Sequence, residues 1–424
     1  MAGYAARKRP SEGVRHRLRA KALALEDSRG GRGVLVTADL IGFRRTVADE
    51  TAGRLERQYG LARERLILNA SHTHSGPVVG ETPYYAALDA GGRQAVERYT
   101  AGLIENVSAL VGQAIEALAP AALEFEQGLA GIAVNRRRAR AGWRHLPAPV
   151  DHDVPVLGVK DPQGRLRAVV AGYACHATSL GDYLISGDWP GFAQAEIERA
   201  HAGALALFVQ GCGADSNPLP RYQGTEPALV GYAADLPRMY GRIFAAAVEL
   251  VLHARMKPVG DGLRAAWDTV ELPYRDVPSR EKLEKQAAGG TEQERVAARR
   301  LLARLEREGA LPAGYRYPVQ VWRLGEALKL IALAGEVTVD YSLRLKAQHG
   351  WGDTWVAAYS NDVFGYVPSL RVLREGGYEG GQANLALPGR FSAAIEEIIV
   401  EKVAELVERT AGPQVRSEPD AISG

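Results

Sequence analysis

The sequence predicts an α/β fold in which a mixed or parallel β-sheet core is flanked by helices. Short apolar runs of strand length alternate along the 424-residue chain with longer segments whose apolar residues recur every three or four positions. The apolar runs lack the polar alternation of half-exposed strands, so we expect strands that are buried on both faces. This alternation of strands and helices is typical of an α/β core.

Six apolar runs predict the strands, and each ends in polar residues or glycines. The runs are VLVTADL at 34–40, LILN at 66–69, AVVAGYA at 168–174, LALFVQ at 205–210, LKLIAL at 328–333 and WVAAY at 355–359. Between them, segments with apolar residues at helical spacing predict helices. These segments cover 88–118, 192–202 and 239–254.

Two segments near the C-terminus differ in composition from the rest. Residues 279–309 are highly charged, have a helical period and are interrupted by Gly289-Gly290, which predicts an exposed helical hairpin inserted into the core. A partner-binding arm is the alternative to a solvated helix pair here. Residues 391–409 carry an apolar stripe and predict a helix that packs on the core. The tail at 412–424 is expected to be disordered.

Charge and composition exclude several classes of protein. The chain has 52 Lys and Arg against 50 Asp and Glu, and a net charge of +2 provides no field to hold nucleic acid or an anionic membrane. No apolar run approaches ~18 residues, so we expect no transmembrane segment. Two cysteines exclude a disulfide framework and a cysteine-rich zinc module.

The N-terminal 33 residues carry nine Lys and Arg against three Asp and Glu, but they lack the apolar region and the small-residue cleavage site of a signal peptide. We therefore expect a cytoplasmic location for the chain as it stands, and a secreted or periplasmic one if a segment precedes Met1. We interpret Arg7-Lys8-Arg9 as part of a solvated, partly mobile end, with a basic recognition arm as the alternative.

Residues with metal-binding or catalytic chemistry follow several of the predicted strands. Ligand sites in α/β sheets lie beyond the carboxyl ends of the strands. Three of the nine histidines stand at such positions, and a glutamate and a tyrosine occupy the same topological place. Chance would scatter them along the chain. In chain order, these residues are His72, His74, His176, Glu336 and Tyr366.

Imidazoles and a carboxylate from separate strand ends match a hydrolytic zinc site that keeps a position open for water. Zinc would lower the pKa of that water to ~7 and polarise a carbonyl. In an extended chain, His72 and His74 would aim their rings to the same side, because side chains repeat with period two. For these two with His176 and Glu336, we favour a metal site over satisfied polar residues.

Two other groups of residues have reactive or ligand-type side chains. Cys175 and His176 are neighbours that point to opposite faces of a strand and cannot pair as nucleophile and base. Cys212 stands in a Gly-rich loop, but we interpret both cysteines as small core residues. Asp151-His152-Asp153 precedes the strand predicted at 154–159, and we interpret this segment as a turn with solvated charges.

The segment SHTHSGP at 71–77 is very similar to the THTHSGP stretch of the neutral/alkaline ceramidase family. Further segments resemble family motifs and occur in the family's order. They are Asn135-Arg136, the histidine-bearing strand end at 174–178, the glycine-aspartate loop at 210–218, Gly335-Glu336 with Thr338, and the two-tyrosine segment from Asn361 to Gly380. The resemblance covers most of the chain. It implies one ceramidase-like zinc hydrolase domain over 1–411.

The resemblance also implies a role for seven residues. The expected zinc ligands are His72, His176, Glu336 and Tyr366. The residues expected around the scissile amide are His74, Arg136 and Tyr378. The family hydrolyses an N-acyl amide bond, and in that reaction Tyr378 or Arg136 would stabilise the oxyanion while His74 passes the proton to the leaving amine.

The glycine-aspartate loop departs from the family pattern Gly-Asp-x-Ser-Pro-Asn. Here it reads GADSNP at 213–218, and alignment on the Asp-x-x-Pro spacing places Asn217, rather than Ser216, at the family's serine. An asparagine can donate to an oxyanion but cannot be acylated, which disfavours a serine nucleophile. The chain also ends one helix after the last motif, so we expect a short form without the family's C-terminal immunoglobulin-like domain.

We therefore expect a zinc-dependent amidohydrolase that cleaves the N-acyl amide bond of a ceramide-like or other N-acylated lipid or amine. A zinc-dependent esterase or lactonase on the same scaffold and a non-catalytic metal-binding homologue are the alternatives. A missing accessory domain favours a soluble or smaller substrate over membrane ceramide. The sequence leaves the oligomeric state open.

Overall fold

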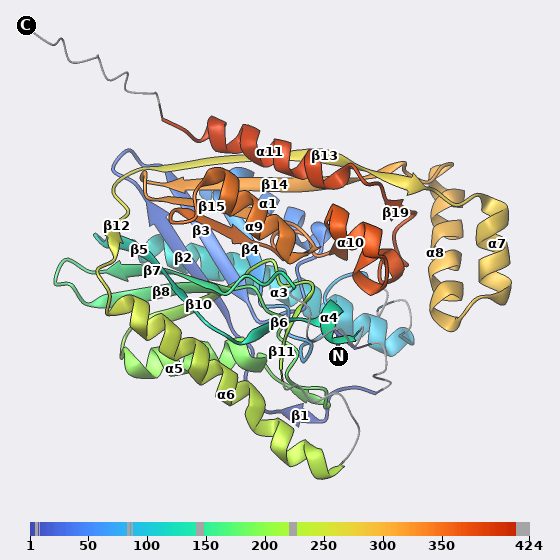
Figure 1. The fold of residues 1–424 in the computed structure, drawn as a ribbon, viewed down its shortest axis with the longest axis horizontal. Coiled ribbons are helices and arrows are strands. Elements are labelled where there is room, and N and C mark those ends of the chain that lie inside the picture. Colours follow the sequence, from blue (N-terminus) through green and yellow to red (C-terminus); the bar gives the residue numbers. More distant parts are fainter. Residues whose placement is uncertain are drawn as a thin grey trace, which may run out of the picture.

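Three β-sheets pack against one another in the interior of the computed structural model (Figure 1). The structure describes residues 1–4, 7, 9–82, 85, 88–140, 148–219 and 227–412. Leu35, Val170 and Leu330 come from the three different sheets and belong to the same buried apolar cluster. The strands are therefore buried on the faces that the sheets turn toward one another.

Each sheet contains one parallel strand pair. The first sheet has the order β2-β3-β4, with β3 and β4 parallel. The second has the order β10-β8-β7-β5-β12, with β10 and β8 parallel. The third has the order β17-β15-β14-β13-β19, with β15 and β17 parallel. The bounds are β2 (Ala20–Glu26), β3 (Arg32–Ala38), β4 (Leu66–Ala70), β5 (Ala122–Leu129), β7 (Asp153–Lys160), β8 (Leu166–Tyr173), β10 (Leu205–Gln210), β12 (Lys257–Pro258), β13 (Leu263–Asp276), β14 (Gly314–Leu324), β15 (Leu328–Leu333), β17 (Thr354–Ala357) and β19 (Arg390–Phe391).

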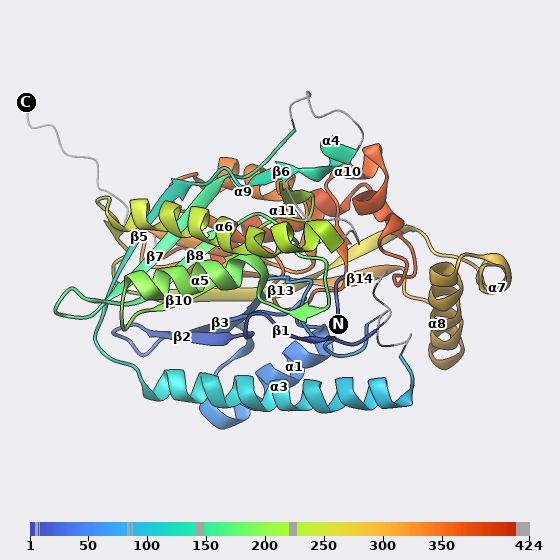
Figure 2. The same ribbon diagram turned by 90° about the horizontal axis from the view of Figure 1, so that it is seen from below.

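Helices cover the outer faces of the sheets (Figure 2). Helices α1 and α3 pack on the first sheet, α5 and α6 on the second, and α9 and α11 on the third. Their bounds are α1 (Arg45–Tyr59), α3 (Ala90–Glu116), α5 (Asp188–Ala200), α6 (Pro227–Leu252), α9 (Val339–His349) and α11 (Ile395–Arg409). This arrangement confirms the predicted α/β class, with a mixed sheet core flanked by helices. In the described part of the chain, no helix combines the length and the apolarity that crossing a bilayer requires.

All six apolar runs form strands within two residues of the predicted bounds. Helix α6 begins well before its predicted start, because Pro237 lies inside the helix instead of preceding it. The sequence does not predict β13 and β14. These antiparallel strands interleave charged residues with apolar ones, and much of β13 is only partly buried, so neither shows a continuous apolar run.

Helices α7 (Arg280–Gly289) and α8 (Glu292–Glu308) form the predicted hairpin, which projects from one end of the molecule (Figure 1). Thr291 begins α8 with a reciprocal pair of hydrogen bonds to Glu294. The hairpin has its own small apolar cluster around Leu283 and Leu301, and most of its other side chains reach solvent. The predicted disordered tail lies outside the described residues apart from Gly412.

Short elements follow the ends of the parallel strands and carry site residues. Strand β6 (Ala133–Asn135) pairs with β11 (Ser216–Pro218), and β16 (Glu336–Val337) pairs with β18 (Tyr366–Val367). The other short elements are β1 (Gly13–Val14), η1 (Arg63–Arg65), α4 (Arg136–Arg140), β9 (Leu184–Ile185), α10 (Leu370–Glu375) and η2 (Tyr378–Gln382).

One buried amide joins the carboxyl ends of strands from all three sheets. The side chain of Asn69, at the end of β4, is fully buried. Its Nδ2 donates to the carbonyl of Ala358, just beyond β17, at 2.7 Å. Its Oδ1 accepts a hydrogen bond from the backbone N–H of Gln210, at the end of β10, at 2.8 Å. The strand ends that precede the predicted site residues are therefore fixed to one another.

Replacement of Asn69 by alanine should destabilise the protein strongly, because the buried N–H of Gln210 loses its acceptor and the carbonyl of Ala358 keeps only the hydroxyl of Ser360 as a donor. We expect a loss of about 3 kcal/mol in the free energy of unfolding, measured by urea denaturation. Asn106→Ala, at an exposed position of α3, is the matched control and should change stability by less than about 0.5 kcal/mol. Equal stability of the two variants would show that the hydrogen bonds of the Asn69 side chain do not hold the sheets together.

Candidate metal centre

His72 and His74 lie in the loop that follows β4, and their rings meet. The two Nε2 atoms are 3.1 Å apart, and the ring centroids are 4.8 Å apart. The extended geometry expected for this pair is wrong: His72 has φ 59°, in the left-handed region. A non-glycine residue in that region is strained and is held there by its surroundings. The rings converge because the chain turns at His72.

His176 follows β8 and is fully buried. Its ring centroid lies 5.1 Å from that of His72. The carbonyl of His176 accepts a hydrogen bond from Trp189 Nε1 at 2.9 Å, and its N–H donates to the carbonyl of Ser216 at 3.0 Å. The backbone of this histidine is thus fixed between α5 and β11.

Glu336 follows β15 and brings a carboxylate to the histidines. Its Oε2 lies 3.2 Å from His72 Nε2 and 3.3 Å from His176 Nε2. This oxygen is buried. Despite the short distances, no atom of the described residues meets it with hydrogen-bonding geometry.

The hydrogen bonds of the other ring nitrogens explain why Glu336 Oε2 has no hydrogen-bond donor. His72 Nδ1 lies 2.6 Å from the carbonyl oxygen of Ile41, and His176 Nδ1 lies 2.7 Å from that of Gly213. A carbonyl only accepts, so both Nδ1 atoms carry the proton and both Nε2 atoms present lone pairs. Two lone pairs and a carboxylate oxygen therefore face one point, an arrangement that a cation stabilises.

Burial favours the neutral, ligand form of His74 and of His176. Burial, together with Arg136, lowers the pKa of His176 to about 4. Burial and the neighbouring His72 hold the pKa of His74 well below its ordinary value. The potential ligand atoms of His72, His74 and His176 all lie within 4.8 Å of one another. The residues present thus fit a divalent metal ion, and the identity of each ligand stays a prediction.

Tyr366 is placed beside Glu336 by the pairing of β16 with β18, in which the two residues are partners. Its hydroxyl is 3.0 Å from Arg136 Nη2, which donates to it. Tyr366 is buried, and burial raises its pKa well above the ordinary value of a tyrosine. The structure therefore brings the fourth predicted ligand to the same site.

Arg136 is buried and held at its Nε by Glu379 Oε1, at 2.8 Å. Burial opposes its charge, but Tyr366 and Glu379 raise its pKa above the ordinary value. Its Nη1 lies 3.4 Å from Asn217 Oδ1. The structure thus places Asn217 at the site beside the guanidinium, whereas the buried hydroxyl of Ser216 finds no hydrogen-bond partner in the described part of the chain.

Tyr378 lies at the exposed side of this group. Its ring centroid is 5.4 Å from that of Tyr366, and the Cζ of Arg136 is 5.9 Å from the Tyr378 ring. Nearly half of its surface is exposed (46%). Of the predicted site residues, Tyr378 is the one placed to meet a ligand arriving from solvent.

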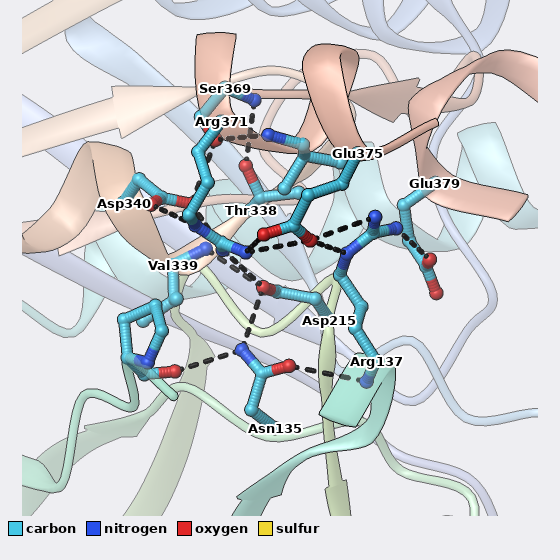
Figure 3. Close-up of polar contacts among 12 residues, drawn as sticks. Asn135, Arg137, Asp215, Thr338, Val339, Asp340, Ser369, Arg371, Glu375 and Glu379 are labelled. Atoms are coloured by element: carbon cyan, nitrogen blue, oxygen red, sulfur yellow. Dashed lines mark hydrogen bonds and ion pairs between the residues drawn. The ribbon is translucent and has the colours of Figure 1, made fainter. Parts of the chain in front are cut away.

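A second network of polar groups surrounds the buried carboxylate of Asp215 (Figure 3). The carboxylate of Asp215 is fully buried and accepts from Val339 N–H at 3.0 Å, from Asn135 Nδ2 at 3.0 Å and from Arg371 Nη2 at 3.2 Å. Arg137 pairs with Glu379 at 2.7 Å and also pairs with Glu375. The loops that carry the site residues are therefore joined by charge-assisted hydrogen bonds.

The N-terminal residues also contact the site, which the sequence analysis missed. Gly3 has φ +98°, and a Cβ on it would lie 2.5 Å from the His74 side chain. The Tyr4 ring packs edge-on against His74, with centroids 4.8 Å apart. Arg7 donates to the carbonyl of His74, so the interpretation of this residue as part of a solvated end is wrong. Lys8 lies outside the described residues. No local signal marks these contacts, which depend on the fold.

Two further interpretations can be compared with the structure. Cys175 and Cys212 are buried, and burial raises the pKa of the Cys212 thiol, as expected for core residues. The solvated turn predicted at Asp151 is wrong. That carboxylate is buried and accepts from the equally buried Lys346 at 2.7 Å.

Comparisons with known proteins agree with this geometry. The family model described as "Neutral/alkaline non-lysosomal ceramidase, N-terminal" matches residues 1–217, about half of the chain. The neutral ceramidase of Pseudomonas aeruginosa is 26% identical over 96% of this chain and 70% of its own length. Neutral ceramidase A of Dictyostelium discoideum is 26% identical over 49% of this chain, and the matched region covers 30% of that protein.

Two solved structures share the fold. The crystal structure of the Pseudomonas aeruginosa neutral ceramidase has a TM-score of 0.70 at 22% identity, covering 96% of this chain and 72% of the other. A structure described as "Ceramidase complexed with C2" has a TM-score of 0.73 at 20% identity, covering 99% of this chain and 74% of the other. The family model, the relatives and the shared fold together show that the chain belongs to the neutral/alkaline non-lysosomal ceramidase family.

Proposed function

We propose that the protein is a zinc-dependent hydrolase that cleaves the N-acyl amide bond of a ceramide-like or other N-acylated lipid or amine. The observation that carries the proposal is the meeting of His72 Nε2, His176 Nε2 and Glu336 Oε2 at one point, while the Nδ1 atom of each ring faces a backbone carbonyl. The relatives named neutral ceramidases support the choice of an amide substrate.

The donor set favours zinc over other divalent ions. Two neutral imidazoles and a carboxylate, with the phenolic oxygen of Tyr366 nearby, make a mixed nitrogen and oxygen set that suits Zn²⁺ and is poor for Mg²⁺ or Ca²⁺. When bound by these residues, zinc would polarise the amide carbonyl and lower the pKa of a water molecule to about 7. Gly213 and Ile41 orient the two imidazoles through their carbonyls.

Arg136 supplies the fixed positive charge of the site. Because Glu379 holds its Nε, the other two nitrogens of the guanidinium remain directed at Tyr366 and Asn217. Hydrogen-bond donors that are held in place before reaction stabilise an oxyanion without reorganisation. Arg136 and the half-exposed Tyr378 are therefore the proposed oxyanion donors, and Asn217 can contribute its amide.

His74 is the proposed proton carrier. It is neutral, because burial and its neighbours hold its pKa well below the ordinary value, so its ring can accept a proton. An amine leaves an amide readily only after it has been protonated, whereas an activated ester needs no such step. The effect of replacing His74 on amide and ester hydrolysis therefore distinguishes the amidohydrolase from the esterase or lactonase alternative.

Replacement of Glu336 by glutamine should remove the bound metal and the activity together. We expect about one zinc per chain in the wild type by elemental analysis, and a loss of more than about 100-fold in turnover of an N-acyl amide in the variant. A chelator should reproduce the loss, and added zinc should reverse it in the wild type alone. Glu326→Gln, at an exposed glutamate, is the control and should keep both properties. If the Glu336→Gln variant keeps its metal and its normal activity, the proposal is contradicted. If the wild type binds metal but hydrolyses no acyl substrate, the non-catalytic alternative is favoured.

Replacement of His74 by alanine should reduce amide hydrolysis far more than ester hydrolysis. We expect a fall of about 100-fold or more in kcat for an N-acyl amide, and a much smaller fall for the matched nitrophenyl ester of the same acid. Metal content is measured in parallel, because an unchanged content shows that the metal ligands are intact. Equal losses on both substrates would support the esterase or lactonase alternative.

A further inference from the structure

A cleft of about 590 Å³ lies between helix α8 and the body of the protein. Its walls come from α8, from the start of β14, from the start of α1 and from the loop at 386–388. Two glutamates and six arginines line it, which gives the cleft a strong positive charge. The arginines are Arg44, Arg45, Arg300, Arg304, Arg307 and Arg316.

Half of these arginines pair with carboxylates. Arg45 pairs with Asp362 at 2.9 Å, and Arg304 and Arg307 both pair with Glu308 at 2.7 Å. These three guanidiniums therefore share two carboxylates, and one net positive charge remains among them.

The other three arginines have no carboxylate partner within the described ranges. Arg44 donates to the carbonyl of Val363 at 2.7 Å, and Arg316 donates to the hydroxyl of Thr269 at 3.0 Å. Both contacts are to neutral groups. Arg300 has a buried Nη1 that finds no hydrogen-bond partner at all in the described structure. Burial and the nearby Arg44 lower the pKa of Arg300, and the nearby Glu81 only partly opposes this shift.

A buried hydroxyl lines the same cleft. Tyr274 is only 8% exposed, and its Oη has no hydrogen-bond partner among the residues that the structure describes. An unpaired buried donor is costly, and so is a buried guanidinium nitrogen without a partner, such as that of Arg300 in the wall of the same cleft. An oxyanion with several acceptor oxygens satisfies both the guanidinium and the hydroxyl.

The cleft is joined to the candidate metal centre by two residues. Phe364 lines the cleft, and its Cε1 would lie 3.2 Å from a Cβ on Gly335, which directly precedes Glu336. Asn384 fixes the loop of the cleft to the backbone of Tyr366, accepting from its N–H and donating to its carbonyl, each at 2.8 Å. Phe364 and the segment at Asn384 therefore lie between the cleft and the backbone of Glu336 and Tyr366.

We propose that this cleft binds a carboxylate or phosphate group of the substrate, so that the protein prefers anionic N-acyl amides to neutral ones. The inference that the anion belongs to the substrate rests on the proposed hydrolytic function. The apolar side chains of Leu301, Leu387 and Phe364 line the cleft between the charges and suit an amphiphilic molecule. Arg300 and Tyr274 bind the oxyanion, and Arg44 adds its charge.

The test compares each anionic amide with a neutral counterpart. N-acyl glycine is paired with N-acyl glycinamide, and N-acyl phosphoethanolamine with N-acyl ethanolamine, so that the two pairs distinguish carboxylate from phosphate. We expect kcat/KM to favour the anionic member of at least one pair by about 10-fold or more, and Arg300→Gln to abolish the preference mainly through KM. Arg300→Lys should retain part of it, and added salt should weaken it.

Arg299→Gln is the matched control, because Arg299 is an exposed neighbour on α8 outside the cleft. This variant should keep the wild-type preference. A wild type without any preference, or a preference that survives Arg300→Gln, would overturn the proposal.

Direct binding separates this proposal from the proposed hydrolysis. Inorganic phosphate and N-acyl glycine are titrated into the full chain by calorimetry at low ionic strength. If no amide is hydrolysed, but Arg300→Gln weakens binding about 10-fold while Arg299→Gln does not, the anion site stands and the hydrolytic function alone fails. Equal binding to the wild type and Arg300→Gln would overturn the anion site, whatever the activity.

Discussion

The buried amide of Asn69 is the constraint on which the candidate site depends. It connects β4, β10 and β17, one strand from each sheet, at the ends where the chain leaves toward the site. His72 follows β4 itself, while His176 and Glu336 follow β8 and β15, which pair with β10 and β17 in their sheets, so the distances among these predicted ligands are set by how the sheets meet. Without a fixed junction, side chains more than two hundred residues apart could not keep nitrogen and oxygen atoms within about 3 Å of each other.

The same site carries local features that do not favour stability. His72 adopts a left-handed backbone conformation, and a buried carboxylate oxygen faces two lone pairs. Such strain persists only where the surroundings determine it, and it concentrates at functional sites. Here the surroundings are the carbonyls of Ile41 and Gly213, which orient the rings, and the polar network around Asp215. These contacts stabilise a geometry whose benefit appears only when a cation is bound.

The sequence predicts the strands of the inner core well and the strands β13 and β14 poorly, for a physical reason. A strand such as β10 or β15 is buried on both faces and shows as an uninterrupted apolar run. Strands β13 and β14 interleave charged residues with apolar ones, so no comparable run marks them. The site residues can be identified from the sequence because they follow the apolar runs. The geometry in which they meet cannot be predicted in this way. The turn at His72 and the contact of Gly3 with His74 arise from parts of the chain that meet only in the folded protein.

Chemistry and specificity are carried by different parts of this molecule. The metal-centre residues lie on loops that the three sheets hold rigidly, and this frame is shared with relatives of the family. The hairpin of α7 and α8 projects from this frame with a small apolar cluster of its own, and α8 supplies charge to the cleft. A wall of guanidinium groups binds a long hydrocarbon chain poorly, because each charge must remain solvated or paired. Under the two proposals, amide hydrolysis therefore follows from the shared frame, and the preference among substrates follows from the cleft beside α8.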